Sequence, residues 1–98
     1  MKKYSSLSEK QQAKIVQQNG DDIQYIDNPS EKIQLLAVAN KKFAIEDIKN
    51  PTEKTQLFCV NQDGYMIRFI ENPTEKVKFA AIKQNGFSKH GLKTQLKK

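Results

Sequence analysis

The chain has 98 residues, enough for one ordinary domain with little room for a second. A single cysteine excludes an internal disulfide framework, and neither a signal-peptide stretch nor a membrane-spanning window is present, so we expect a cytoplasmic protein. The net charge of +6 is unevenly placed: residues 1–75 hold ten Lys or Arg against eleven Asp or Glu, whereas residues 76–98 hold seven lysines and no carboxylate.

Four similar units of 22 residues follow one another and leave a short basic tail. The units span 6–27, 28–49, 50–71 and 72–93, and the tail spans 94–98. They open with SLSE, NPSE, NPTE and NPTE. Ser or Asn is a favoured helix N-cap, proline suits the first helical position, and glutamate three residues on can complete a capping box. We therefore predict a helix capped by the first residue of each unit, namely Ser6, Asn28, Asn50 and Asn72.

The first half of each unit continues as a helix of about eleven residues. We call residues that occupy the same position in successive units a column, and three columns are apolar. They are Ala13/Leu35/Leu57/Phe79, Ile15/Ala37/Cys59/Ala81 and Val16/Val38/Val60/Ile82. Adjacent apolar positions and several alanines favour a helix buried on two sides over a strand. Gly20, Gly64 and Gly86 predict a left-handed residue after this helix, and Lys42 must accept strain there or end its helix differently.

The second half of each unit predicts a shorter helix, because isoleucines recur three residues apart. The Asn-Pro of the next unit then ends this helix. The pairs are Ile23/Ile26, Ile45/Ile48 and Ile67/Ile70. A competing interpretation is a β-hairpin formed by YMIRFI and KVKFAAI around ENPTE, which the caps and alanines disfavour. We therefore predict one all-α domain over residues 1–98, a short α-solenoid of four helix-turn-helix repeats with a period of 22 residues.

The strings NPSEKIQLLAV and NPTEKVKFAAIKQNGF resemble a short tandem α-helical repeat family of unknown function found in bacterial, phage and giant-virus proteins. The resemblance covers residues 6–92 and implies helical hairpins and an origin in a mobile element. It implies no catalysis, and no functional residue carries over from it, because the family has no agreed biochemical activity.

Residues for catalysis or metal binding are sparse. His90 is the only histidine and has no acid near it in sequence, so it is predicted to be a plain surface residue. Cys59 lies in an apolar column and is predicted to be a buried filler. Neither metal-ligand spacing nor a phosphate-binding glycine loop is present. We expect no catalytic residue, no metal and no cofactor, and therefore a protein that is not an enzyme.

A binding surface is the more promising prediction, although these positions could equally be a solubilising surface. Tyr25 and Phe69 share a column with Asp47, which indicates partial exposure, so both are candidate contact residues. Gln34, Gln56 and Arg68 belong to polar columns and are candidates for the same surface. Of the five aromatic residues in the second halves, we expect at least half to be core. The five are Tyr25, Phe43, Tyr65, Phe69 and Phe87.

The C-terminal end departs from the repeat, since Lys89 replaces an isoleucine and Gly91 interrupts the short helix. A polar outer face is expected of a terminal repeat. That expectation does not explain why residues 76–98 contain seven lysines and no Asp or Glu. These lysines could neutralise phosphates without reading a sequence. They are Lys76, Lys83, Lys89, Lys93, Lys97 and Lys98.

We therefore expect a non-enzymatic binding module that docks on a protein or nucleoprotein complex of a bacterial host. A phage or prophage accessory protein fits the resemblance, and inhibition of a host defence complex, as by small anti-CRISPR proteins, is one form this would take. The alternative is a nucleic-acid-binding protein that uses its lysine-rich C-terminus. A third alternative is a fragment of a longer array with a structural role. We expect no membrane partner, and a monomer or weak self-association.

Overall fold

A computed structural model describes residues 2–85 of the chain, which are all-α and contain no strand. Four α-helices alternate with three 3₁₀ helices, which are labelled η. The order is α1 (Glu9–Gln18), η1 (Gly20–Tyr25), α2 (Glu31–Asn40), η2 (Lys42–Asp47), α3 (Glu53–Gln62), η3 (Gly64–Phe69) and α4 (Glu75–Asn85). The repeated helical unit is thus confirmed, and the hairpin interpretation is wrong for this part of the chain.

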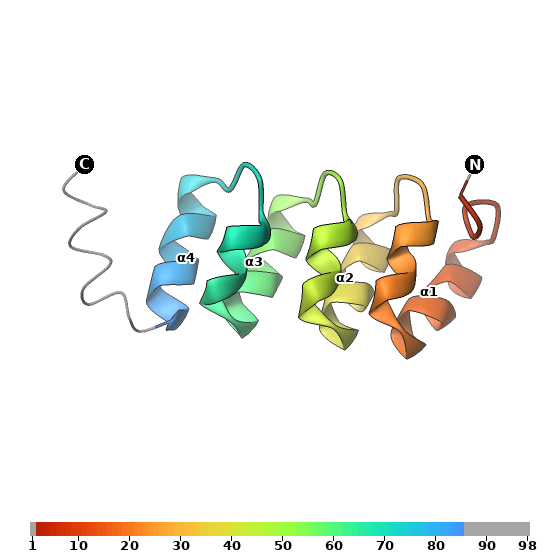
Figure 1. The fold of residues 1–98 in the computed structure, drawn as a ribbon, viewed down its shortest axis with the longest axis horizontal. Coiled ribbons are helices and arrows are strands. Elements are labelled where there is room, and N and C mark those ends of the chain that lie inside the picture. Colours follow the sequence, from red (N-terminus) through yellow and green to blue (C-terminus); the bar gives the residue numbers. More distant parts are fainter. Residues whose placement is uncertain (1, 86–98) are drawn as a thin grey trace.

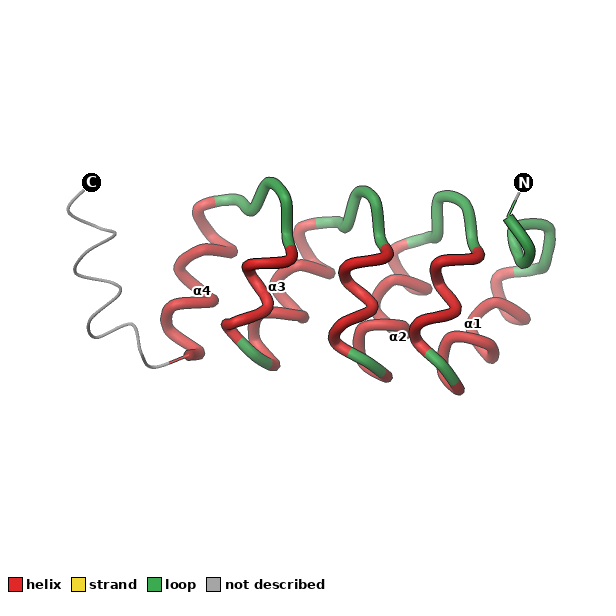
Figure 2. The backbone as a smooth tube through the Cα atoms, viewed as in Figure 1, coloured by secondary structure: helices red, strands yellow, loops and turns green. Residues whose placement is uncertain are grey.

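The helices form two layers, with the α-helices side by side in one and the η helices side by side in the other (Figure 1). The connections from each η helix to the next α-helix all lie along one edge (Figure 2). The described chain measures 47 × 20 × 15 Å and has a radius of gyration of 14.5 Å. A compact globular chain of this length would have a radius of about 12 Å. The molecule is therefore an elongated solenoid in which each repeat packs on its neighbours.

Each α-helix begins two residues later than the sequence predicts. The N-caps of the first three are Ser8, Ser30 and Thr52, whose hydroxyls accept bonds from the backbone N–H three residues on. Asn28 instead lies before the helix, with φ of 48° in the left-handed region that asparagine tolerates. The prediction of caps at Ser6, Asn28, Asn50 and Asn72 is wrong, because Ser or Thr at the third tetrad position performs the capping.

Two of the tetrad glutamates, Glu9 and Glu53, join successive repeats. In α1 the capping box is completed by Gln11, not by Glu9. The Ser30 hydroxyl donates to the Glu9 carboxylate of the preceding repeat, and the Thr74 hydroxyl donates to Glu53 at 2.7 Å. Each of these hydroxyls also accepts a backbone N–H of its own helix. In the second and fourth units the tetrad therefore both starts a helix and ties it to the repeat before.

The core runs along the middle of the solenoid between the two layers. Val16, Val38 and Val60 are fully buried, as their column predicts. The isoleucine pairs also turn inward: the first lies in the 3₁₀ helix, and the second is the extended C-cap residue whose backbone N–H donates to the carbonyl oxygen of the first. The exception is Ile67, which is only partly buried and packs beside buried Met66. One further buried column, missed from the sequence because it contains a threonine, consists of Ile33, Thr55 and Val77.

The turn between α1 and η1 uses glycine for space. Asn19 and Lys41 end α1 and α2 in extended conformations, with φ of −151° in both, and Gly20 is the first residue of η1. A Cβ atom on Gly20 would lie 2.4 Å from the Ala37 carbonyl oxygen. The predicted left-handed residue is therefore wrong at Gly20 and Gly64, the latter being the first residue of η3; Gly86 lies outside the described residues. Lys42 needs no strained backbone.

Candidate functional site

Three exposed aromatic side chains lie on η2 and η3. The exposed fractions are 47% for Phe43, 58% for Tyr65 and 36% for Phe69. Phe43 of η2 and Phe69 of η3 pack edge to face, with ring centroids 5.6 Å apart. Together with Arg68 we call these residues the aromatic face. With Tyr25 also exposed, all four described second-half aromatics lie at the surface, so the prediction that half of them are core is wrong.

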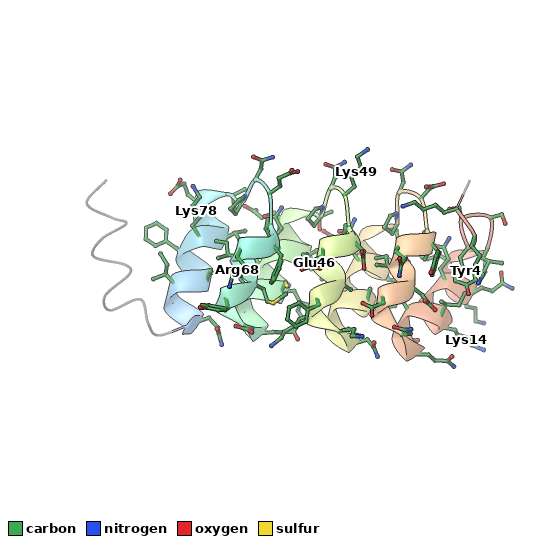
Figure 3. The ribbon with its side chains drawn as sticks, viewed as in Figure 1. Tyr4, Lys14, Glu46, Lys49, Arg68 and Lys78 are labelled. Carbon is green, nitrogen blue, oxygen red and sulfur yellow. The ribbon has the colours of Figure 1, made fainter. Side chains whose placement is uncertain are left out.

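Arg68 is stacked on two rings of the aromatic face. Its guanidinium carbon lies 5.3 Å from the Tyr65 ring centroid and 5.9 Å from that of Phe69. Figure 3 places Arg68 on η3, in the same layer as Glu46 of η2. Arg68 takes part in none of the ion pairs formed within residues 2–85. Its planar set of donors is thus positioned by aromatic contacts and is still available to a carboxylate or phosphate.

Lys42 contacts the aromatic face at Phe43. Its Nζ atom lies 5.9 Å from the Phe43 ring centroid and 2.8 Å from a carboxylate oxygen of Asp63. The bond from Lys42, helped by the backbone N–H of Tyr65, holds the pKa of Asp63 below its usual value. The cation of Lys42 is therefore already paired, whereas Arg68 is paired with no carboxylate of the described range 2–85.

Tyr25 does not join the aromatic face, although it shares a column with Phe69. It packs edge to face on Tyr4 at 6.0 Å, and Lys3 lies over both rings. The backbone N–H of Lys2 donates to Asp27, which lowers the pKa of that carboxyl. Residues 2–7 thus cover the first repeat, and Tyr25 belongs to that contact. The predicted surface is therefore split between Tyr25 at one end and Phe69 with Arg68 at the other.

Acidic side chains occupy the η layer between these two ends. Asp47 holds the column position between Tyr25 and Phe69. Partial burial, followed by repulsion from Asp21 and Glu46, raises the pKa of Asp47. Asp21 also pairs with Lys41 at 2.7 Å. The η layer is thus acidic between Tyr25 at one end and the aromatic face at the other.

Gln34 and Gln56 are buried, with exposed fractions of 5% and 8%, so the surface exposure expected of them is wrong, and their role as contact residues stays a prediction. Their side-chain amides donate to the carbonyl oxygens of Pro29 and Pro51 at 3.1 and 3.0 Å. Burial is tolerated because each side-chain amide nitrogen finds a carbonyl partner in the connection leading into its own helix. The column is polar for structural reasons.

Two equivalent pockets lie along the edge where successive repeats meet. The first-joint pocket has a volume of about 370 Å³, and Gln34 and Asp47 are among its lining residues. The second-joint pocket has a volume of about 570 Å³, and the equivalent residues Gln56 and Phe69 line it together with Arg68. The two pockets share one wall, formed by Ile48, Lys49 and Asn50. The second of them adjoins the aromatic face through Arg68 and Phe69.

The other predicted residues are dispersed. Lys76 and Lys83 are exposed on α4, whereas Lys89, Lys93, Lys97, Lys98 and His90 lie outside the described residues. Cys59 is fully buried, as predicted, and burial raises the pKa of its thiol to about 11. Residues 2–85 bring no three His, Cys, Asp or Glu side chains together as a metal site. The same residues form no helix with the length and hydropathy needed to cross a bilayer.

No protein-family model matches this chain, and no curated protein or solved structure does so either. The resemblance to the short helical-repeat family stays a prediction from the repeated strings. The candidate site accordingly rests on its own geometry, namely an exposed aromatic pair, a stacked arginine and an adjoining pocket.

Proposed function

We propose that the chain is a non-enzymatic binding module that docks on another protein through the aromatic face. The observation that carries this proposal is the exposed edge-to-face pair of Phe43 and Phe69 with Arg68 stacked beside it. Aromatic residues and arginine are the side chains that dominate the energy of protein interfaces. Phe43 and Phe69 come from neighbouring repeats, so the face is fixed by the packing of η2 on η3.

The repeat itself argues against a purely solubilising or structural role for these rings. Asp21 occupies the column of Phe43, and Asp47 occupies the column of Phe69. The fold therefore accepts a carboxylate at both positions, and aromatic side chains are not needed there for folding. Exposed apolar clusters of this kind mark interaction sites in soluble proteins.

The partner class follows from the resemblance together with this face. We propose a protein, or the protein part of a nucleoprotein complex, of a bacterial host, with the chain acting as a phage or prophage accessory protein. Inhibition of a defence complex remains one form of that role. The nucleic-acid alternative draws support from Lys76 and Lys83 alone among the described residues, and the test below separates the two.

The test uses substitutions that the repeat already contains. The double variant Phe43→Asp and Phe69→Asp copies the residues of the preceding unit, and Phe79→Ala, which copies Ala13, changes an exposed ring on α4. Tagged chains are used to capture proteins from nuclease-treated bacterial lysate. We expect a stoichiometric protein with the wild type and with Phe79→Ala, and its loss with the double variant while the helical circular dichroism is kept. Equal capture by the double variant would refute the proposal, and recovery that requires nucleic acid would favour the alternative.

A further inference from the structure

Gln56, which lines the second-joint pocket, has a buried side-chain oxygen. Among residues 2–85 its Oε1 atom has no hydrogen-bond partner, although its Nε2 atom donates to Pro51. At the equivalent position of the preceding repeat, Oε1 of Gln34 accepts the backbone N–H of Thr52 at 3.1 Å. A buried polar atom left unpaired is unfavourable, and a ligand that supplies a donor gains from satisfying it. The second-joint pocket is therefore incomplete in a way that the first-joint pocket is not.

The same pocket carries the guanidinium of Arg68, which forms no ion pair with residues 2–85. Arg68 lines it beside Phe69, whereas the equivalent positions one repeat earlier are Glu46 and Asp47. Lys49 adds a second cation, and Glu46 and Glu71 also line the pocket, so its formal charges balance. Selection of a ligand there depends on the directed donors of the stacked guanidinium, which fit a carboxylate in a two-point contact.

The pocket also continues along the edge of the solenoid. Ile48, Lys49 and Asn50 form a wall common to it and the first-joint pocket. Neighbouring helices pack about 8–10 Å apart, which is the length of about three residues of an extended chain. A ligand in this position can therefore pass through as an extended segment instead of ending in the pocket.

We propose that the second-joint pocket binds an extended peptide segment of the partner, in which an internal acidic side chain bonds to Arg68 and a neighbouring backbone N–H donates to Gln56. Phe69 and Ile70 offer the apolar contact beside them. The volume of about 570 Å³ lies within the range of sites that hold small ligands. This inference rests on the proposed function, because it gives the chemistry of the partner that the aromatic face would engage.

Three pentapeptides are added in turn to the full chain labelled with nitrogen-15. Two of them have capped termini, and the third has a free C-terminal carboxylate. One has a central glutamate, one a central glutamine, and one a central glutamine with a free C-terminal carboxylate. We expect the glutamate peptide to shift the side-chain resonances of Gln56 and Arg68, and the neutral peptide to shift them far less. Equal shifts with the glutamine peptide, shifts only with the free C-terminal carboxylate, or no shift with any peptide would each overturn the proposal.

Two variants give the matched comparison. Arg68→Lys keeps the positive charge but loses the planar two-point contact, so we expect at least about a tenfold loss of affinity for the glutamate peptide. Gln24→Ala changes the same column outside the pocket and should leave affinity unchanged. An Arg68→Lys variant that binds as tightly as the wild type would overturn the role of Arg68.

The two proposals fail in different ways. Phe43 belongs to the aromatic face but does not line the second-joint pocket. Loss of the captured protein with Phe43→Asp, combined with peptides that do not bind, would overturn the pocket inference and keep the proposed function. The opposite result is that the peptides bind through Arg68 while the Phe43→Asp and Phe69→Asp double variant captures the protein as well as the wild type does. That result would overturn the proposed function and keep the peptide site.

Discussion

The backbone N–H of Gly20 donates to Oδ1 of Asn40 at 2.7 Å, although the two residues belong to successive repeats. The amide nitrogen of Asn40 in turn donates to the Gln17 carbonyl oxygen at 2.9 Å. Gln84 does the same for the third repeat, accepting from Gly64 at 2.6 Å and donating to the Gln62 carbonyl at 3.4 Å. A side chain of the following repeat thus satisfies the turn of the preceding one. Such contacts between neighbours set the stability of a solenoid.

Replacing Gly20 with alanine should destabilise the protein by about 1–3 kcal/mol, because the added methyl group must displace a backbone carbonyl. The Cβ atom would lie 2.4 Å from the Ala37 oxygen. Urea unfolding followed by circular dichroism measures the change. Lys42→Ala is the control at the same column position, and it should shift the midpoint far less, because it removes only a surface ion pair with Asp63. Equal midpoints for wild type and Gly20→Ala would contradict the close approach.

Replacing Asn40 with alanine should cost about 1–3 kcal/mol, because the Gly20 N–H and the Gln17 carbonyl both lose a partner. The same unfolding measurement applies. Gln18 holds the equivalent position in the first repeat and makes no side-chain hydrogen bond to another repeat within the described range, so Gln18→Ala should change stability by less than about 0.5 kcal/mol. Similar losses for the two variants would show that the bridge adds nothing beyond an ordinary surface amide.

Much of the fold could be predicted from the sequence, because the information is local and repeated. The 22-residue period, the valine column and the isoleucine pairs follow from spacing alone. The register of the caps could not be predicted in the same way. Asn28 and Ser30 are both good N-cap residues two positions apart, and only the packed structure distinguishes them. The role of Glu9 also depends on a contact 21 residues away.

The candidate site was predicted in part. Phe69 and Arg68 lie together, as a contact surface requires, whereas Tyr25 lies at the other end of the η layer. Gln34 and Gln56 were misplaced because polarity suggests exposure, while a glutamine that bonds to a nearby carbonyl can be buried. The exposure of Phe43 could have been inferred, since its column contains Asp21 and that carboxylate would not be left unpaired in a core.

Asp47→Asn should stabilise the protein at neutral pH. The folded-state pKa of Asp47 is raised, first by burial and then by Asp21 and Glu46, so its ionisation opposes folding. That unfavourable contribution is fully present above the folded pKa, shrinks as pH falls through it, and vanishes below the ordinary value of 3.8. Urea midpoints measured from pH 7 down to pH 3 should therefore converge for wild type and variant. Asp22→Asn is the control, and a difference that is constant with pH would contradict the assignment.

The Cys59 thiol should resist labelling in the folded protein and thereby report on unfolding. Its side chain is fully buried, donates to the Lys42 carbonyl at 3.7 Å, and has a pKa raised to about 11 by burial. Because the thiolate is the reactive form, a disulfide reagent at pH 8 should react only at the rate of opening, and faster in mild urea.

The same shift makes stability depend on pH in a defined direction. Between the ordinary thiol pKa of 9.0 and about 11, the unfolded chain releases its proton before the folded chain does. The free energy of unfolding should therefore fall as pH rises through this window. Cys59→Ala, which copies Ala37 and Ala81 of the same column, should remove that part of the pH dependence at a cost of about 1 kcal/mol or less at pH 7. Rapid labelling of the native protein, or an unchanged alkaline slope in the variant, would show that Cys59 is not held as a buried neutral thiol.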